Sequence, residues 1–234
     1  MKTGVMQPYF FPYLGYWQLM NAVDTYVVYD DVNYIKGGRI NRNTILLEGK
    51  AHNINLILCG ASPNLCINEV RVSGESLWRE KLLRTIFQAY KKAPFSEQVM
   101  PIIEDIVNNQ EENLAKFLLH SFETIGTYLG IQTKLILSSD IPKNNDLKGR
   151  YKLYDIFSTL GTTEYYNSVN GISLYAEHSA EFTENGIALH FLKMNPVEYP
   201  QFRNEFIPNL SIIDVMMFNS QEQCRELLKQ YELL

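Results

Sequence analysis

Short β-branched and aromatic runs alternate along this chain with longer segments whose apolar residues recur at helical spacing. Strand-like runs lie at residues 3–6, 25–29, 133–137 and 187–192, and helical patterns lie at residues 14–22, 76–92, 98–108, 112–129, 150–160 and 221–234. One turn signal, Glu48-Gly49-Lys50, joins two further apolar runs and predicts an antiparallel hairpin. Strands that alternate with helices are typical of a mostly parallel sheet covered by helices. The sequence therefore predicts an α/β fold with an inserted hairpin.

The middle of the chain contains helical patterns without an intervening strand. These patterns occupy residues 76–130 and predict a helical cap over the sheet. We find no internal repeat, low-complexity stretch or linker. We therefore expect residues 1–234 to form a single domain with a helical insertion at about residues 76–130. A chain of 234 residues is long enough to bury a sizeable core.

The charge balance limits the classes of ligand. The formal net charge is −5, and basic residues occur only in short mixed runs such as Lys36-Gly37-Gly38-Arg39. A nucleic-acid-binding protein usually carries a basic excess or a basic stripe, so binding to DNA or RNA is not expected. One or two well-placed cations are still sufficient for a small anionic ligand.

Cysteine and histidine usage gives no sign of a disulfide framework or a metal site. Three cysteines without close spacing are typical of reduced, buried thiols. The four histidines show no metal-ligand spacing, although one of them could act as a general base. We expect no metal ligand, and the sequence identifies no cofactor.

The N-terminus runs directly into patterned sequence and has no apolar signal core. No stretch approaches the roughly 20 apolar residues of a membrane span. We therefore expect a cytoplasmic protein without a membrane span, whose connection to the envelope would be a soluble precursor or a partner.

The most informative segment is residues 5–19, in which a buried strand leads through an aromatic loop, broken by two prolines, into a helix. Ligands of open α/β sheets bind at the carboxyl ends of strands, and a helix N-terminus suits phosphate or carboxylate. Alternatively, the large aromatic side chains Phe10, Phe11 and Trp17 could be core packing. The candidate binding residues in this segment are Gln7, Pro8, Tyr9, Tyr13, Gly15, Tyr16 and Gln18.

Within this segment, Tyr13-Leu14-Gly15-Tyr16 has the position and layout of the phosphate-gripping His-x-Gly-His motif in nucleotidyltransferase-like and class I synthetase-like domains. Tyrosine can donate a hydrogen bond to phosphate but carries no positive charge near neutral pH. The resemblance therefore favours a nucleotidyltransferase-like, or Rossmann-like, sheet layout more than it favours adenylylation.

Several motifs in order along the chain resemble the WbqC-like family. They are residues 6–16, Tyr29-Asp30-Asp31-Val32, Asn41-Arg42-Asn43, Leu137-Ser138-Ser139 and residues 210–214. The family occurs with genes for O-antigen and other surface polysaccharides. The resemblance implies transfer of glycine or another acyl group to an amino sugar. The chain departs from the family pattern at Asn167-Ser168, where Ser-Gly is more typical, and at Lys50-Ala51-His52, where an aromatic residue is common.

Asp30 and Asp31 follow a predicted strand directly. Adjacent carboxylates at a strand end could bind a metal, act as a base or orient an amine. Because side chains alternate along a strand, we expect only one of the two to enter a site. A solvated turn is the alternative.

Two further motifs suit an anionic group. Asn41-Arg42-Asn43 places a guanidinium between two amides, which suits carboxylate or phosphate, although Asn turns in a surface loop are the alternative. Ser138 and Ser139 follow a strand and precede a loop with several cations, so they could form an anion cradle, although a strand-end cap is the more common role.

A polar loop at residues 165–171 could contact a sugar through Tyr166 and Asn167. Ser211 is expected to cap a helix that Asp214 reinforces, which is a structural role.

The leading hypothesis is an acyl- or aminoacyl-transferase that acts on an amino sugar, possibly nucleotide-linked. In this hypothesis Asp30 or Asp31 deprotonates the amine, Arg42 holds the anionic part of a substrate, and Asn41, Asn43 and Gln7 orient polar groups. The alternatives are a nucleotidyltransferase or adenylate-forming enzyme that needs a triphosphate and Mg²⁺, and a non-catalytic scaffold of a polysaccharide assembly complex. The leading hypothesis requires the aromatic loop, the acidic pair and the Asn-Arg-Asn segment to meet at one pocket.

Overall fold

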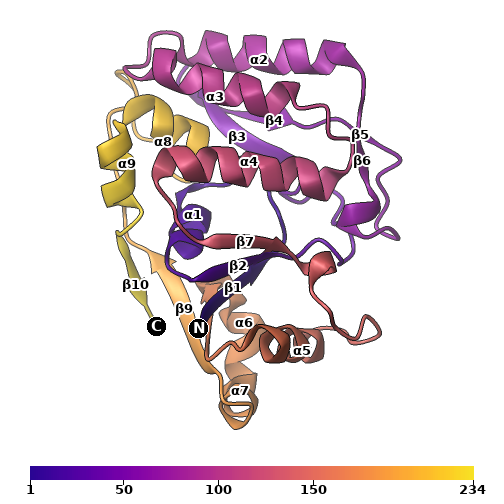
Figure 1. Ribbon diagram of the computed structural model, residues 1–234. Coiled ribbons are helices and arrows are strands. Elements are labelled where there is room, and N and C mark those ends of the chain that lie inside the picture. The colour runs from indigo at the N-terminus through magenta and orange to yellow at the C-terminus, as the bar shows by residue number, and fades with distance from the viewer.

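A six-stranded sheet lies at the centre of the computed structural model, which describes residues 1–234 (Figure 1). Five strands run parallel, and β10 pairs antiparallel with β9 at one edge. This arrangement confirms the predicted α/β fold with a mostly parallel sheet. The strands are β1 (Lys2–Met6), β2 (Thr25–Val28), β7 (Lys134–Leu137), β8 (Glu164–Ser168), β9 (Ala188–Met194) and β10 (Tyr231–Leu233).

The order of the strands identifies where a ligand would bind. Across the sheet the order is β10-β9-β8-β1-β2-β7. Numbered along the chain within this sheet, that is the 3-2-1-4-5-6 order of doubly wound folds. The chain begins in the middle with β1, builds one side through β2 and β7, and then returns to add β8 on the other side. The order therefore reverses between β1 and β8, and ligands in such sheets bind outside the carboxyl ends of the strands at this reversal.

Helices cover both faces of the sheet (Figure 1). The larger core, of 48 buried residues, lies on the face of α1 and the helices between β2 and β7, whereas the core on the other face has nine. Most of the apolar burial that stabilises the fold therefore lies on the α1 face. The helices are α1 (Leu14–Asn21), α2 (Ser76–Tyr90), α3 (Ser96–Asn108), α4 (Leu114–Leu129), α5 (Arg150–Leu160), α6 (Ile172–Tyr175), α7 (Ser179–Glu184), α8 (Ile212–Phe218) and α9 (Gln221–Leu227).

Local sequence signals explain the inserted elements. The hairpin strands β3 (Arg42–Leu47) and β4 (Lys50–Asn55) are joined by Glu48 and Gly49, both with positive φ, as a tight hairpin turn requires. Helix α4 ends at Gly130, which adopts the left-handed conformation of a helix C-cap. A second short antiparallel pair, β5 (Leu58–Cys59) and β6 (Arg71–Val72), precedes α2.

The prediction of a terminal helix over residues 221–234 is wrong in its second half. Helix α9 ends at Leu227, and residues 231–233 form the edge strand β10. The buried amide of Gln18 donates to the carbonyls of Leu227 and Gln230, at 2.8 and 3.0 Å, and so satisfies the end of the helix. Beyond it, the unpaired edge of β9 offers the chain a ladder of backbone hydrogen bonds.

Residues 165–168 were also expected to lie in a loop, but they belong to strand β8. They pair with both β1 and β9, so their backbone groups are satisfied inside the sheet.

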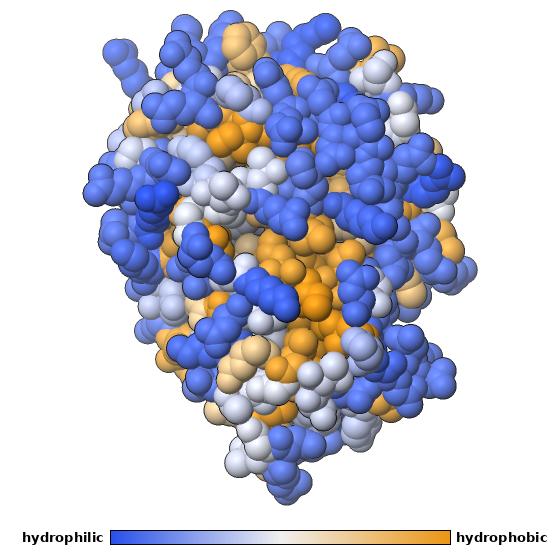
Figure 2. All heavy atoms as spheres, in the orientation of Figure 1, coloured by the Kyte–Doolittle hydropathy of each residue, from blue (hydrophilic) through white to orange (hydrophobic).

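Strand β7 forms the other edge of the sheet, remote from β8 and β9. Figure 2 shows an apolar strip at the place where β7 lies in Figure 1, between the upper and lower groups of helices. Leu135 and Ile136 of β7 are half-buried. None of the helices combines the length and apolar character needed to cross a membrane.

Candidate functional site

The loop after β1, residues 7–13, is named the aromatic turn here, and it is held in a strained conformation. Phe11 has a φ of 45°, in the left-handed region that a bulky residue rarely adopts. Asn43 donates from its side-chain nitrogen to the carbonyls of Phe10 and Phe11, at 2.9 and 2.7 Å. The hydroxyl of Ser211 donates to the carbonyl of Phe11 at 2.9 Å. Strain of this kind persists only where surrounding contacts impose it, and it is frequent at functional sites.

The large aromatic side chains of this region are core residues. Phe10, Phe11 and Trp17 are fully buried, and the indole of Trp17 donates to the carbonyl of Pro12 at 3.1 Å. Tyr16 is also buried, and its hydroxyl donates to the carbonyl of Gln7 at 2.8 Å. The second tyrosine of the Tyr-x-Gly-Tyr motif is therefore directed into the protein rather than toward a ligand.

A cleft of about 480 Å³ lies where the strand order reverses, and it is named the switch-point cleft. Its walls come from the aromatic turn, the start of α1, and the carboxyl ends of β8 and β9, together with Arg39, Asn43 and Asn209. This is the position expected for a ligand of a doubly wound sheet. Its polar side chains are Tyr9, Tyr13, Arg39, Asn43, Ser168, Asn170, Lys193 and Asn209.

The cleft has a positive electrostatic character. Arg39 contacts Thr44 Oγ1 at 3.1 Å and has no carboxylate partner, whereas the exposed Lys193 pairs with Glu232 at 2.6 Å. Helix α1 begins at the cleft, and its N-cap residue Tyr13 provides no side-chain cap. The N–H of Tyr16 donates to the carbonyl of Tyr13 at 3.0 Å, and Gly15 is the residue of α1 that lines the cleft.

Gly15 lets the ring of Tyr13 pack over the start of α1. A Cβ atom at residue 15 would lie 2.6 Å from Cε2 of Tyr13, which is closer than side-chain atoms approach. Burial raises the pKa of the Tyr13 hydroxyl, and burial also raises that of Tyr9, although Arg39 opposes the rise at Tyr9. Both hydroxyls are therefore protonated at neutral pH and can donate hydrogen bonds.

The acidic pair and the serine pair meet at the adjacent carboxyl ends of β2 and β7. Asp30 is fully buried and accepts from the backbone nitrogen and the hydroxyl of Ser139, at 2.9 and 2.6 Å. Burial raises the pKa of Asp30, and the hydrogen bonds from Ser139 oppose that rise. Ser138 is buried next to this carboxyl group, and its carbonyl accepts from Lys143.

Asp31 forms two buried ion pairs. Its carboxylate lies 2.7 Å from Nζ of Lys143 and 3.0 Å from Nζ of Lys152, and these two lysine side chains are 1% and 7% exposed. Burial disfavours the charged form of Asp31, but the neighbouring Lys143, Ser138 and Lys152 outweigh it and lower the pKa. Neither Asp30 nor Asp31 lines the switch-point cleft.

The three residues of the Asn-Arg-Asn segment make different contacts. Only Asn43 reaches the cleft and the aromatic turn. Asn41 bonds to Leu56 and Tyr34, and the exposed Arg42 donates to the carbonyls of Gly37 and Gly38.

The remaining predicted residues do not line the cleft. Tyr166 donates to Glu164 at 3.1 Å, and Asn167 donates to the hydroxyl of Tyr165 at 2.6 Å. Pro8 is buried and Gln7 is half-buried in the aromatic turn. Two of the three segments required by the leading hypothesis thus share the cleft, and the acidic pair lies outside it.

Five polar residues of the cleft were not selected individually from the sequence: Arg39, Ser168, Asn170, Lys193 and Asn209. Two of them, Ser168 and Asn170, lie in the polar loop at residues 165–171 that was predicted as a possible sugar contact. A signal was present for Arg39, which follows two glycines, and for Asn209, a residue type that tolerates its observed φ of 59°. No local feature of the sequence pointed to Lys193, because a lysine in a strand indicates only that its side chain is exposed. No three His, Cys, Asp or Glu side chains come together in a way that could hold a metal ion.

Replacement of Asn43 by alanine is expected to lower the free energy of unfolding by about 2–4 kcal/mol, because the carbonyl of Phe10 loses its partner and that of Phe11 keeps only Ser211. Urea denaturation measures the loss. Asn53→Ala, at an exposed position of β4, is the matched control and should change stability by less than about 0.5 kcal/mol. Equal effects of the two changes would contradict the proposed support of the turn.

A doubly wound α/β sheet with a polar cleft at its switch point is characteristic of small-molecule-binding α/β proteins. The family model of the WbqC-like protein family matches residues 7–226, and the chain belongs to this family. It is similar to the uncharacterized protein Rv1507c of Mycobacterium tuberculosis, with 25% identity over 231 residues that cover 97% of each chain. No solved structure matches the chain.

Proposed function

We propose that this protein is a transferase that moves an acyl or aminoacyl group onto an amino sugar, most simply a nucleotide-linked one, during synthesis of O-antigen or another surface polysaccharide. The observation that carries the proposal is the switch-point cleft, which combines tyrosine hydroxyls, amides and Arg39, a cation without a carboxylate partner, beside the start of α1. Membership of the WbqC-like family supports the link to polysaccharides. The proposed substrate is a soluble cytoplasmic precursor.

The lining groups divide according to the chemistry of such a substrate. Arg39 suits the phosphates, and Lys193 can add to it where it leaves its exposed pair with Glu232. Ser168, Asn170 and Asn209 suit sugar hydroxyls, because their side chains form no hydrogen bond within the chain that would have to break. Asn43 is already committed to the aromatic turn and acts by positioning it.

In the proposed step the amine nitrogen attacks the acyl carbonyl carbon. An amide bond forms, the bond from that carbon to the donor's leaving group breaks, and the amine proton passes to the leaving group or to water. Holding both substrates in one cleft supplies rate enhancement through proximity. Deprotonation by Asp30 or Asp31 is not part of the proposal, since both carboxylates are bonded elsewhere and lie outside the cleft.

Arg39→Ala is expected to weaken the binding of a UDP-linked amino sugar about 10- to 100-fold, since a hydrogen bond to a charged group contributes about 1.5–3 kcal/mol. Isothermal titration calorimetry measures the change. Arg84→Ala is the matched control, because this exposed arginine of α2 does not line the cleft. Equal weakening by both changes, or binding without product from any activated glycyl or acyl donor, would contradict the proposal.

Nucleotidyl transfer is a second candidate, favoured by the strand order and by the start of α1. Its weakness is that the hydroxyl of Tyr16 is buried against Gln7, so only Tyr13 of the motif faces a ligand. Thermal stabilisation by ATP or CTP with Mg²⁺, absent with the nucleotide sugar, would favour this candidate. Pathway output that is unaffected by Arg39→Ala would instead favour a non-catalytic scaffold.

A further inference from the structure

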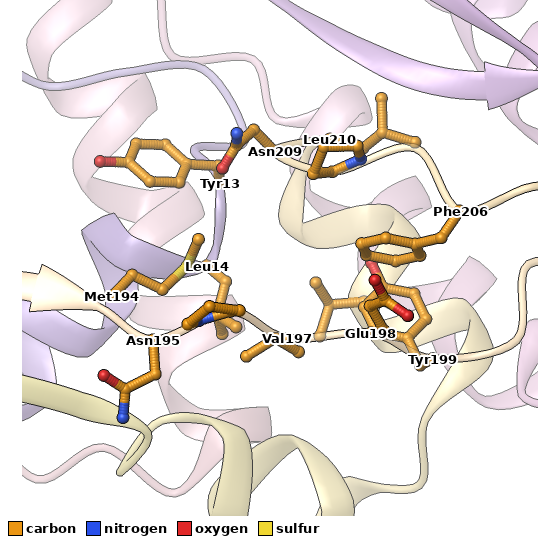
Figure 3. A pocket seen from close by; sticks show the side chains of 13 residues that line it. Tyr13, Leu14, Met194, Asn195, Val197, Glu198, Tyr199, Phe206, Asn209 and Leu210 are labelled. Carbon is orange, nitrogen blue, oxygen red and sulfur yellow. The ribbon is translucent and has the colours of Figure 1, made fainter.

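A second cavity, of about 290 Å³, adjoins the switch-point cleft and is named the apolar pocket (Figure 3). The two cavities share Tyr13, Met194 and Asn209 as a common wall. Most residues that line the second cavity are hydrophobic. Adjoining cavities of opposite character can hold the two parts of one reaction, with the reacting atoms at the shared wall.

Two aromatic rings and one exposed carboxylate, that of Glu198, form the far end of the apolar pocket. Figure 3 shows Tyr13 and Asn209 together at one end, Tyr199 and Phe206 at the other, and the side chain of Asn195 turned away. The rings of Tyr199 and Phe206 meet edge to face, with centroids 5.0 Å apart. The interior between the two ends is apolar, with Leu14 and Val197 among its side chains.

The buried carboxylate of Asp214 fixes the part of the apolar pocket that Tyr199 forms. Asp214 is fully buried and accepts from the hydroxyls of Tyr90 and Tyr199, at 2.8 and 2.9 Å, and from the amide of Gln201 at 2.7 Å. The hydroxyl of Tyr199 is therefore committed to Asp214, and its ring lines the pocket. The segment between β9 and α8 is thereby held over a preformed cavity.

We propose that the apolar pocket binds the hydrocarbon chain of a thioester-activated acyl donor, whose carbonyl lies at the shared wall beside the amino sugar. This inference rests on the proposed transfer function and narrows its donor. A glycyl group has no chain to fill the pocket. At that end the polar edge of a nucleobase would find one free polar side chain, the exposed Glu198, since the hydroxyl of Tyr199 is already bonded to Asp214.

The step balances without a further reactant. The amine nitrogen forms a bond to the acyl carbon, the carbon–sulfur bond of the thioester breaks, and the thiolate takes the amine proton. The products are the amide and the free thiol.

A series of straight-chain acyl-pantetheine thioesters, from acetyl to octanoyl, tests the inference by calorimetry on the full chain. Affinity is expected to rise about fourfold for each added methylene until the pocket is full, because burial of one methylene contributes about 0.8 kcal/mol. An affinity that does not depend on chain length overturns the inference.

A pair of variants tests where the acyl chain of the donor binds. Val197→Phe fills the apolar pocket and should weaken octanoyl binding at least tenfold, with binding of the UDP-linked amino sugar unchanged. Val169→Phe is the matched control, since Val169 lines only the switch-point cleft and its replacement should weaken sugar binding alone. Val197→Ala enlarges the pocket and should favour longer chains, which keeps the test open if the phenylalanine variant does not fold.

The outcomes separate the two proposals. If the protein binds the UDP-linked amino sugar but its affinity for acyl-pantetheines does not depend on acyl chain length, the acyl inference is overturned and the proposed function stands. Chain-dependent acyl binding without sugar binding overturns the proposed function. Displacement of octanoyl-pantetheine by uridine or adenosine alone, abolished by Val197→Phe, would assign the pocket to a nucleobase and overturn the inference.

Discussion

Replacement of Asp31 by asparagine is expected to lower the free energy of unfolding by about 3–5 kcal/mol. The carboxylate is the shared partner of Lys143 and Lys152, whose ammonium groups lie 2.7 and 3.0 Å away and whose side chains are almost wholly buried. Removal of its charge leaves two buried ammonium groups without compensation, which costs far more than the loss of a surface ion pair. Urea denaturation at neutral pH measures the effect.

The same variant should change the acid dependence of stability. The pKa of Asp31 is lowered in the folded protein, so its stabilisation is fully present above the unfolded value of about 3.9 and is lost as the pH falls through the folded value. The wild-type protein should therefore lose an increment of stability below about pH 4 that Asp31→Asn lacks. Asp140→Asn, at an exposed position beyond β7, is the control and should behave as the wild type.

This experiment also separates two roles of Asp31. If the role of Asp31 is structural, the variant should lose stability, and the fraction that remains folded should retain its catalytic turnover. Unchanged stability together with abolished turnover would contradict the structural account and support the predicted role as a base.

Replacement of Asp214 by alanine is expected to lower the free energy of unfolding by about 3–6 kcal/mol. Three donors, the hydroxyls of Tyr90 and Tyr199 and the amide of Gln201, would lose their acceptor in a buried environment, at about 1–2 kcal/mol each. Thermal and urea denaturation measure the loss, and octanoyl-pantetheine binding should fall with it because the wall of the apolar pocket loosens.

Two further variants control this prediction. Tyr199→Phe removes a single donor and should cost only about 1 kcal/mol. Glu205→Ala changes an exposed residue of the same segment and should have no measurable effect on stability. A loss below 1 kcal/mol for Asp214→Ala would show that the network does not hold the segment between β9 and α8.

Much of the fold was predictable because the signals are local. Apolar periodicity identified α2, α3, α4 and α5, and the turn signal at Glu48 and Gly49 identified the hairpin. The terminal strand β10 was not predictable, because its stabilisation comes from hydrogen bonds to β9 rather than from the pattern of residues 228–234. The local periodicity of a segment carries no information about the free edge of a strand elsewhere in the chain.

The site was predictable only in part. The aromatic turn and Asn43 were selected and both line the switch-point cleft. Arg42 was selected for its charge, yet it bonds to its own loop, and Arg39 lies in the cleft instead. Residue type indicated that a cation would be present in this segment, and only the path of the loop determined which arginine lines the cleft.

The sequence by itself determined the order of most helices and strands, the parallel sheet and the family, because these follow from local patterns and from motifs kept in order. The tertiary structure alone decided which polar groups remain free. Asp30, Asp31 and Gln18 are bonded to partners far away in the chain and Tyr16 is bonded to Gln7, whereas the side chains of Ser168, Asn170 and Asn209 form no hydrogen bond within the chain. The physical reason is that each buried donor or acceptor must be satisfied, and its partner is chosen by packing rather than by neighbours in sequence.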